Sequence, residues 1–395
     1  MSPEEPSHQA IIHIGASAIS MLVMEIEGDE KKIVEFLEQP VPIGRDIFSK
    51  GQLTRSTIER CVEVIHGYLI ALRDYGLGPA DLQRLALSNI IAEARNHDAL
   101  LNRISVSTGL HSELLDDGEM TCLIYLKTRR RLQDTPSLSK KTTLVLHVGP
   151  GNTRVILFKK GRIVRYTSYR LGAHRTNEAI DPSRLAGPGQ LRLIRDHISG
   201  QIGQMIFDFA DDQIENIVAI GYEIQHLARH LTLAGQSKSP LPQLRQFIDN
   251  ASLLSDEELV SRYQLDYHTA EALLPALEIN HTIAQQFNLP SIEIPDSDYE
   301  RGLLMDLAAS DTLTTQIGDQ VLRHAKVLGR RYQVNPRHAR HVAFLCQRLF
   351  DELADLHQLS EHDALLLQTA AYLHEVGGFI SPRNHHKHSE YLILN

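Results

Sequence analysis

The chain has 395 residues, 42% of them hydrophobic, and a net charge of −9 at pH 7. This length predicts two or three domains at about 100–200 residues each, and the hydrophobic content is sufficient for buried cores. The negative charge gives no general attraction to nucleic acid or to an anionic membrane, so neither is expected as a partner. No apolar run approaches the ~20 residues that a membrane helix needs.

The start of the chain, MSPEEPSHQA, is acidic and lacks the basic and apolar regions of a signal peptide. Its three cysteines, Cys61, Cys122 and Cys346, lie far apart and form no metal-binding pattern. Separated thiols in odd number are consistent with a reducing compartment, so we expect a cytoplasmic protein. The 21 histidines are the most unusual feature of the composition.

The first predicted domain (residues 1–135) begins with a meander of three strands. Its long helix is expected to start at Ser56, which could form a capping box with Glu59. The polar stretch QDTPSLSKK marks the first domain boundary. The predicted elements are strands at about 10–15, 19–26, 32–38, 85–87 and 112–116, and helices at about 56–75, up to 108, and 118–132.

A strand–turn–strand unit occurs twice. Residues 10–24, AIIHIGASAISMLVM, form an apolar strand, a turn and a second apolar strand, and residues 144–157, LVLHVGPGNTRVIL, repeat the design. Their turns start at His13 and His147, which are 147 − 13 = 134 residues apart. Such a turn can direct backbone N–H groups at a phosphate. The repeat favours two related domains facing each other across a cleft; the alternative is a pair of ordinary hairpins.

The second predicted domain (residues 136–310) contains this second hairpin and a long amphipathic helix. From about Thr312 the periodicity is only helical, so residues 311–395 are expected to form a separate all-α domain. Because the last apolar run, 391–394, needs something to pack on, this domain is expected to be truncated. The other expected elements are strands at about 162–169, 217–220 and 291–294, and helices at 188–209, up to 230, and between 240 and 290.

Several segments together resemble one family. The two hairpins are similar to its phosphate loops, Asp-Ile-Gly-Ser-Asn-Ser and Asp-Ile-Gly-Gly-Gly-Ser-Thr-Glu. The segment with the family's catalytic glutamate corresponds to Leu115–Leu126. Further similar segments are Ser88–Asn96, Leu171–Ala173, Leu373–Gly377 and His385–Tyr391. The chain is identified as a divergent member of the exopolyphosphatase / guanosine pentaphosphate phosphohydrolase (Ppx/GppA) family.

The resemblance implies an α/β fold of duplicated actin-like (ribonuclease-H-like) domains, followed by a C-terminal all-α domain of the HD type. It also implies a phosphatase that acts on polyphosphate or guanosine pentaphosphate in the interdomain cleft with Mg²⁺. A homodimer formed through the helical domain is a further expectation. The family's HD-like positions are occupied here by His338, His374 and Glu375.

Site residues are carried over from the same resemblance. Glu119 is the candidate catalytic base, although a gap-free alignment places Met120 at the family's glutamate. One residue is about 100° of rotation on a helix, so the register decides whether a carboxylate faces the cleft. His13 and His147 occupy the metal positions. The candidate phosphate-binding residues are Gly15, Ala16, Ser17, Gly149, Gly151, Asn152, Thr153 and Arg154.

The chain departs from the family at these positions. Acidic residues that would hold Mg²⁺ are replaced by His13 and His147, and neutral imidazole suits transition metals rather than Mg²⁺. The phosphate-clamping arginine is replaced by Ala92, and the acid of the second loop by Arg154. The family's third loop, Gly-Gly-Thr, reads Gly-Tyr-Glu from residue 221.

Each candidate has a structural alternative. Glu119 could be a helix N-terminal carboxylate, and the two histidines could lie apart without a metal. Arg154 could face phosphate in place of Mg²⁺ or be a solvated strand residue. The basic run at 127–131 could guide a polyanion or form a solvated helix face. The HD-like histidines could bind metal or serve packing.

Two functions remain open. The chain could be an active exopolyphosphatase that releases terminal phosphate with Glu119 as base. It could instead be a pseudo-phosphatase that binds a phosphorylated ligand without turnover. Because removing one preorganised charge commonly costs a factor of about 10²–10³ in rate, the combined losses favour weakened or lost Mg²⁺-dependent hydrolysis.

Overall fold

The architecture comes from a computed structural model, which describes residues 7–27, 30–121, 123–124, 140–180, 187–232, 237–295, 303–305, 307 and 310–394. The chain divides into two compact units, Met1–Ala308 and Ala309–Asn395. Both predicted actin-like domains belong to the first unit. The predicted boundary between residues 135 and 136 and the basic run at 127–131 lie outside the described residues. No helix in the described part of the chain has the length and apolar character needed to cross a membrane.

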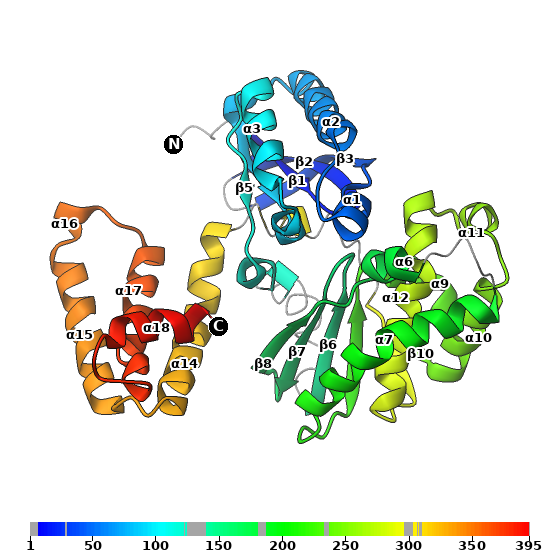
Figure 1. Cartoon of the computed structure of the whole chain (residues 1–395). Coiled ribbons are helices and arrows are strands. Elements are labelled where there is room, and N and C mark those ends of the chain that lie inside the picture. Colours follow the sequence, from blue (N-terminus) through cyan, green and yellow to red (C-terminus); the bar gives the residue numbers. More distant parts are fainter. Residues whose placement is uncertain are drawn as a thin grey trace. The chain divides into compact units, whose positions relative to one another are not determined.

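The first half of the first unit is built on a five-stranded sheet in the order β3-β2-β1-β4-β5 (Figure 1). β1 pairs antiparallel with β2 and parallel with β4, so the chain crosses over between them. The predicted meander is confirmed, because β1 pairs antiparallel with β2 and β2 pairs antiparallel with β3. The strands are β1 (Ser7–Ile14), β2 (Ala18–Glu27), β3 (Glu30–Pro40), β4 (Leu82–Leu87) and β5 (Glu113–Leu114).

Helices cover this sheet. Along α2 the apolar residues recur at helical spacing, and Ile58, Cys61, Val62 and Ile65 are buried in the core. The helix begins one residue before Ser56, and Thr54 is the N-cap that accepts from the N–H of Thr57, so the predicted Ser56 cap is wrong. The elements are α1 (Ile43–Lys50), α2 (Arg55–Arg73), η1 (Pro79–Asp81), η2 (Asn89–Glu93) and α3 (His97–Thr108).

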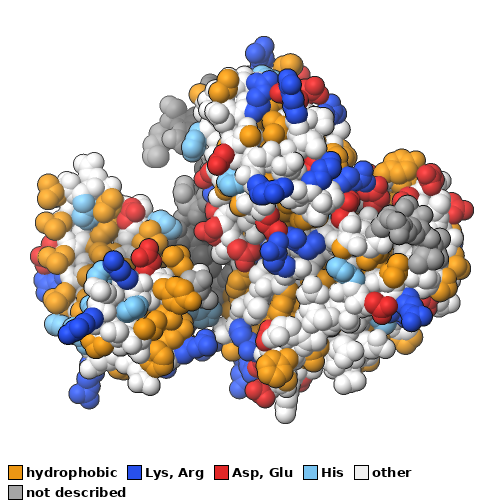
Figure 2. Space-filling model, viewed as in Figure 1, with side chains coloured by type: hydrophobic (Ala, Val, Ile, Leu, Met, Phe, Trp, Pro, Cys, Tyr) orange, Lys and Arg blue, Asp and Glu red, His pale blue; other side chains and the backbone are white. Residues whose placement is uncertain are grey.

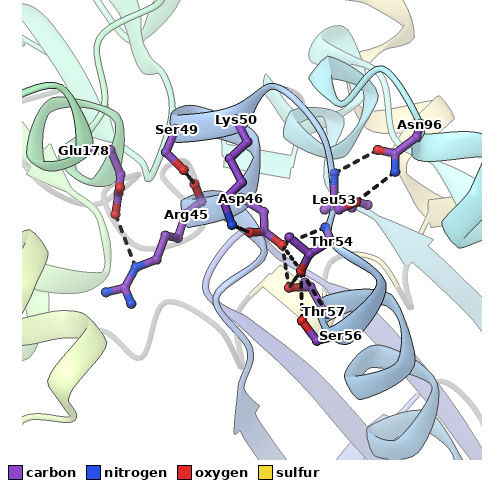
Figure 3. A network of polar contacts seen from close by, with 10 residues as sticks. All are labelled: Arg45, Asp46, Ser49, Lys50, Leu53, Thr54, Ser56, Thr57, Asn96 and Glu178. Atoms are coloured by element: carbon purple, nitrogen blue, oxygen red, sulfur yellow. Dashed lines mark hydrogen bonds and ion pairs between the residues drawn. The ribbon is translucent and has the colours of Figure 1, made fainter.

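A buried carboxylate joins α1 to the start of α2 (Figure 3). Asp46 is 5% exposed and accepts hydrogen bonds from the Thr54 N–H at 2.9 Å, the Thr54 hydroxyl at 2.7 Å and the Lys50 ammonium at 2.9 Å. It also accepts from the Thr57 hydroxyl at 2.5 Å. Burial alone would raise the pKa of Asp46, but these hydrogen bonds outweigh it and lower the pKa to about 2.

Asp46→Ala is expected to destabilise the first unit by about 2 kcal/mol at pH 7, because buried donors lose a charged acceptor. The lowered pKa means that the contribution of Asp46 is present above the pKa of the unfolded chain and is lost as the pH falls towards about 2. Urea unfolding at pH 7 measures the change. Asp98→Ala, at a side chain 89% exposed, is the control and should stay within about 0.5 kcal/mol. Equal effects of the two substitutions would contradict this role.

The second half of the first unit repeats the design on a six-stranded sheet in the order β10-β11-β9-β6-β7-β8. β6 pairs antiparallel with β7 and parallel with β9, as β1 does with β2 and β4. The strands are β6 (Thr142–Val148), β7 (Thr153–Lys159), β8 (Arg162–Tyr169), β9 (Asn216–Ile220), β10 (Lys238–Pro240) and β11 (Ser291–Glu293). The duplicated α/β architecture expected from the sequence is thus present.

The helices of this half pack on the second sheet. The predicted long amphipathic helix is α7, whose Leu191, Ile194, Ile198 and Ile202 are buried in the core. The neighbouring α12 is buried along most of its length. The helices are α6 (Ala173–Ile180), α7 (Pro188–Asp208), α8 (Tyr222–His226), α9 (Ala228–Leu231), α10 (Leu241–Ala251), α11 (Asp256–Tyr263) and α12 (Tyr267–Gln286).

The second unit, called the helical unit below, contains only helices among residues 310–394. Its core is small and consists of Ala325, Val334, Ala339, Leu373 and Val376. From the last apolar run, Leu392 packs on this core, whereas its apolar neighbours are exposed. The elements are α14 (Ser310–Arg331), α15 (Pro336–Glu352), α16 (Ala354–His357), α17 (Glu361–Leu373), η4 (Val376–Phe379) and α18 (His385–Leu394).

Candidate functional site

A cavity of about 90 Å³ is lined by both halves of the first unit. The turn between β1 and β2 and the turn between β6 and β7 both contribute to it, so the two repeated hairpins do meet at one site. The predicted residues in its lining are His13, Gly15, Ala16, Ser17, His147, Gly149, Gly151, Asn152 and Arg154.

The two turns are closed in the same way. The N–H of Gly15 donates to the Ala18 carbonyl at 2.8 Å, and the N–H of Gly149 donates to the Asn152 carbonyl at 2.9 Å. The first turn is also tied to α1, because the N–H of Gly44 donates to the Ala16 carbonyl at 2.7 Å. The N–H groups of Gly15 and Gly149 are therefore engaged within the turns, and the phosphate contacts of the two turns stay a prediction.

The second turn is packed tightly between the halves. A Cβ on Gly151 would lie 2.7 Å from Ile90 Cδ1 and 2.8 Å from Phe48 Cζ, so any larger residue there would require these two side chains to move. Thr153 is fully buried, and its hydroxyl donates to the Leu171 carbonyl at 2.6 Å. Thr153 does not line the cavity. Its hydroxyl fixes the turn, and the geometry gives no support to the predicted phosphate contact.

Arg154 is buried at 3% exposure, so the solvated-strand alternative is wrong. Its Nη2 donates to Asp117 Oδ1 at 2.8 Å and to Asn89 Oδ1 at 3.0 Å. Asp117 also accepts a hydrogen bond from the Tyr166 hydroxyl. The charge of Arg154 is therefore neutralised inside the protein by a carboxylate from the other half of the unit.

His13 and His147 occupy equivalent strand ends, and each is 4% exposed. Each ring lies beside a glycine of its own turn: a Cβ on Gly15 would be 3.6 Å from His13 Cε1, and one on Gly149 would be 3.0 Å from His147 Cε1. Burial lowers the pKa of His13 to about 4, so it is neutral at pH 7.

These two loop ends do not fit Mg²⁺, which prefers hard oxygen donors. Around the cavity, the described residues also contain no group of three metal-ligating side chains whose donor atoms lie close together. Binding of a transition metal by His13 and His147 therefore stays a prediction. Among the described residues no third ligand lies close to both of them.

Met120, not Glu119, lines the cavity, and it is 4% exposed. The Glu119 carboxylate accepts a hydrogen bond from Arg84 Nη2 at 2.6 Å. Glu119 is not among the described residues that line the cavity. The Glu119 N–H donates to Asp116 Oδ1 at 2.7 Å, as expected in the first turn of a helix. The geometry thus matches the helix-terminal alternative, and the catalytic role of Glu119 has no support from its position.

Sequence reasoning missed Glu223, which lines the cavity at the start of α8. It is 3% exposed, and burial raises the pKa of its carboxyl to about 7. Its Oε1 lies 3.9 Å from His174 Nε2, and the His174 ring stacks on His268 with 3.9 Å between ring centres. Burial lowers the pKa of His174 well below its usual value. In the sequence, Glu223 could have been recognised as the acidic residue that follows Gly221-Tyr222 directly after strand β9.

The charges around the cavity do not suit a polyanion. Three carboxylates line it, those of Glu38, Glu223 and Asp266. Among the described lining residues, Arg154 is the only Lys or Arg, and Asp117 already neutralises it. A polyphosphate chain entering this cavity would therefore meet little positive potential.

Ion pairs also hold the two halves together around the cavity. From α1, Arg45 contacts both carboxylate oxygens of Glu271 at 2.7 Å and Glu178 at 3.4 Å. From the second half, Arg175 donates to both oxygens of Glu93 at 2.8 Å and to the Gly151 carbonyl at 2.7 Å. These contacts join the two halves of the first unit.

In the helical unit, the three HD-like residues do come together. The potential ligand atoms of His338, His374 and Glu375 lie within 4.8 Å of one another, which is the only such group among the described residues. His338 Nε2 lies 3.7 Å from Glu375 Oε1, and His374 Nδ1 lies 2.8 Å from the Ala371 carbonyl. The donor set is of the kind that binds transition metals; metal and packing roles both stay open for it.

Comparisons with known proteins agree with this architecture. The family description "Ppx/GppA phosphatase family" matches residues 22–311, and "Ppx/GppA phosphatase, domain III" matches residues 322–395. Similar curated proteins are the guanosine-5'-triphosphate,3'-diphosphate pyrophosphatases of Vibrio atlanticus, 21% identical over 99% of this chain and 76% of the relative, and of Aeromonas hydrophila, 22% identical over 98% and 76%.

Similar solved structures include the Ppx/GppA family member of Aquifex aeolicus, with a TM-score of 0.59 and 16% identity over 78% of this chain and 99% of that chain. An exopolyphosphatase from Cytophaga hutchinsonii has a TM-score of 0.63 and 14% identity over 77% and 98%. At these identities the likeness shows the fold, which is the actin-like, duplicated one. Because the family match covers most of the sequence, this chain belongs to the Ppx/GppA phosphatase family.

Proposed function

We propose that this chain has lost the Mg²⁺-dependent hydrolysis of its family and acts by binding a ligand without turnover. The observation that carries the proposal is Met120, which lines the cavity while the neighbouring Glu119 is held by Arg84. A thioether is neither a general base nor a ligand for Mg²⁺. Loss of one preorganised group already costs a factor of about 10²–10³ in rate.

Two further features of the cavity support this proposal. Phosphoanhydride hydrolysis needs neutralisation of the phosphate charge as well as an oriented water. His13 is neutral at pH 7, so it supplies no charge, and Arg154 is paired with Asp117. Neither His13 nor Arg154 therefore offsets the negative charge of a phosphoryl group during transfer, as the family's metal and arginine would.

The ligands to test follow from the relatives. The curated relatives are named as guanosine-5'-triphosphate,3'-diphosphate pyrophosphatases, and one solved relative is named as an exopolyphosphatase. Polyphosphate and a guanosine pentaphosphate-type nucleotide are therefore the first ligands to test, and the acidic lining of the cavity is expected to keep their affinity low. The homodimer and the cytoplasmic location stay predictions.

The purified full chain is expected to release no phosphate from long-chain polyphosphate or from guanosine pentaphosphate, with Mg²⁺, Mn²⁺ or EDTA. Colorimetric phosphate detection, on protein shown to be folded by its circular dichroism, measures this. Glu119→Gln is the matched variant and should give the same background as the parent chain, because the Glu119 carboxylate is engaged with Arg84.

Phosphate release that needs metal and disappears in Glu119→Gln would establish the alternative, an active exopolyphosphatase with Glu119 as base. Release that needs metal but survives in Glu119→Gln would also overturn the proposal and would assign the base to another residue.

A further inference from the structure

We propose that the cavity of the first unit binds a small aliphatic amine, through the carboxylates of Glu223 and Asp266 and the side-chain amide of Asn152. All three side chains line this cavity. The inference rests on the proposed function, in which the cavity binds a ligand without turnover, and it names the chemistry of that ligand.

The lining of the cavity has an excess of carboxylates. Glu38, Glu223 and Asp266 all contribute to it, and the charge of Arg154 is already neutralised by Asp117. On the face of the first unit seen in Figure 2, Lys and Arg side chains lie among Asp and Glu side chains, so that outer surface carries both signs. The negative potential of the cavity is therefore a local property of its lining, and it attracts a cation.

Two of these carboxylates repel each other. Glu223 is 3% exposed at the start of α8, and Asp266 is the N-cap of α12. Burial is the main cause of the raised pKa of Glu223, and the charge on Asp266 raises it further. Among the described residues, neither carboxylate forms an ion pair with a Lys or Arg: Glu223 faces His174, and Asp266 accepts hydrogen bonds from Thr269. A bound cation would offset this repulsion.

Asn152 carries a buried acceptor that lacks a donor. It is 8% exposed, and its Oδ1 has no hydrogen-bond partner in the part of the chain that the structure describes. His268, which also lines the cavity, has a buried Nε2 without a partner among the same residues. Its Nδ1 lies 3.9 Å from Glu271 Oε2, which favours the ring proton on Nδ1 and leaves Nε2 as an acceptor. Buried acceptors without donors are unfavourable, and the N–H groups of an amine would satisfy them.

The size and the remaining walls of the cavity suit a short aliphatic body. The volume is about 90 Å³, and Ile90, Met120 and Leu303 contribute apolar surface. His13 and His174 add no charge at pH 7, because burial lowers the pKa of both rings. An ammonium group has three N–H donors and no acceptor, so it matches a lining rich in acceptors. A phosphate group would instead meet these carboxylates as like charges.

The test is isothermal titration of the full chain with n-butylamine, n-butanol and tripolyphosphate, at pH 8, above the pKa of Glu223. n-Butylamine is expected to bind with one site per chain. n-Butanol has the same aliphatic body without the charge, and tripolyphosphate has the opposite charge, so both are expected to bind at least about tenfold more weakly. Binding of n-butanol as tight as that of the amine would overturn the role of the carboxylates, and tighter binding of tripolyphosphate would assign the cavity to a polyanion.

Two variants each remove one charge from the lining with little change of shape, Glu223→Gln and Asp266→Asn. Each is expected to weaken n-butylamine binding about tenfold, the effect of losing one charge-assisted hydrogen bond. Asparagine serves as an N-cap as well as aspartate does, so α12 keeps its cap in Asp266→Asn. Circular dichroism shows that both variants are folded.

Glu63→Gln is the matched control. It makes the same substitution at a side chain that is 66% exposed and outside the described lining, so the affinity should change less than about twofold. Equal weakening by Glu63→Gln would replace the site with diffuse attraction to a negatively charged protein. Absence of n-butylamine binding, or no effect of either lining variant, would also overturn the inference. Failure of the proposed function is distinct, because it appears as metal-dependent phosphate release in the hydrolysis assay and not in this titration.

Discussion

Gly172→Ala is expected to destabilise the first unit by about 3 kcal/mol or more, and in the extreme to prevent its folding. A Cβ at this position would lie 2.4 Å from the backbone carbon of Gly151 and 2.5 Å from its Cα and N. Backbone atoms cannot rotate away as a side chain can. Any movement of Gly151 would also have to displace the Phe48 and Ile90 side chains, which lie against it.

Chemical denaturation of the purified variant, followed by circular dichroism, measures this effect. Gly200→Ala is the control, because nothing lies within 4 Å of a Cβ at this exposed position of α7. Alanine in a helix interior is favoured over glycine, so Gly200→Ala should stabilise by about 0.5–1 kcal/mol. A Gly172→Ala variant that unfolds at the same denaturant concentration as the parent chain would show that the two backbone segments can separate without cost.

Glu223→Gln is expected to stabilise the chain at pH 8 by about 3 kcal/mol and to leave its stability at pH 4 nearly unchanged. Burial raises the pKa of Glu223 from the usual 4.5 to about 7. Between these values the folded protein holds a proton that the unfolded chain has released. The contribution of Glu223 is therefore complete below pH 4.5 and is lost as the pH rises through about 7. The difference between these two pKa values corresponds to about 3 kcal/mol of folding stability.

Urea unfolding of both chains at pH 4, 6 and 8 checks this prediction, because titrations of all other groups cancel in the difference between them. Glu63→Gln, at a side chain 66% exposed, serves as the control and should show no pH-dependent difference. If the stability curves of Glu223→Gln and the parent chain run parallel over the whole range, the carboxyl is ionised in the folded state and the assigned shift is wrong.

The sequence predicted well what depends on neighbours along the chain. Both hairpins, the meander of the first sheet and α7 followed from apolar periodicity, which is a local property. The repeat also predicted that the two turns share a site, and they do line one cavity. His338, His374 and Glu375, chosen by resemblance, lie together in the helical unit.

What the sequence could not supply depends on contacts between distant segments. Whether Met120 or Glu119 faces the cavity is a matter of one residue on a short helix, decided by the partner Arg84. The neutralisation of Arg154 required Asp117, from the other half of the unit. Glu223 stands at the third residue of the altered Gly-Tyr-Glu loop, which gave no sign of its role, because its shifted pKa comes from burial that only the assembled core creates.

The repeated sheet has a consequence for how the chain assembles during synthesis. In each half the central strand must wait for a parallel partner about 70 residues later, Ala10 for Leu82 and Thr143 for Asn216. Loop-closure entropy depends on this separation, so the two closures cost about the same. The first sheet can therefore form while the second is still being translated. The ion pair between Arg45 and Glu271, which joins the two halves, can then form only after residue 271 has been translated.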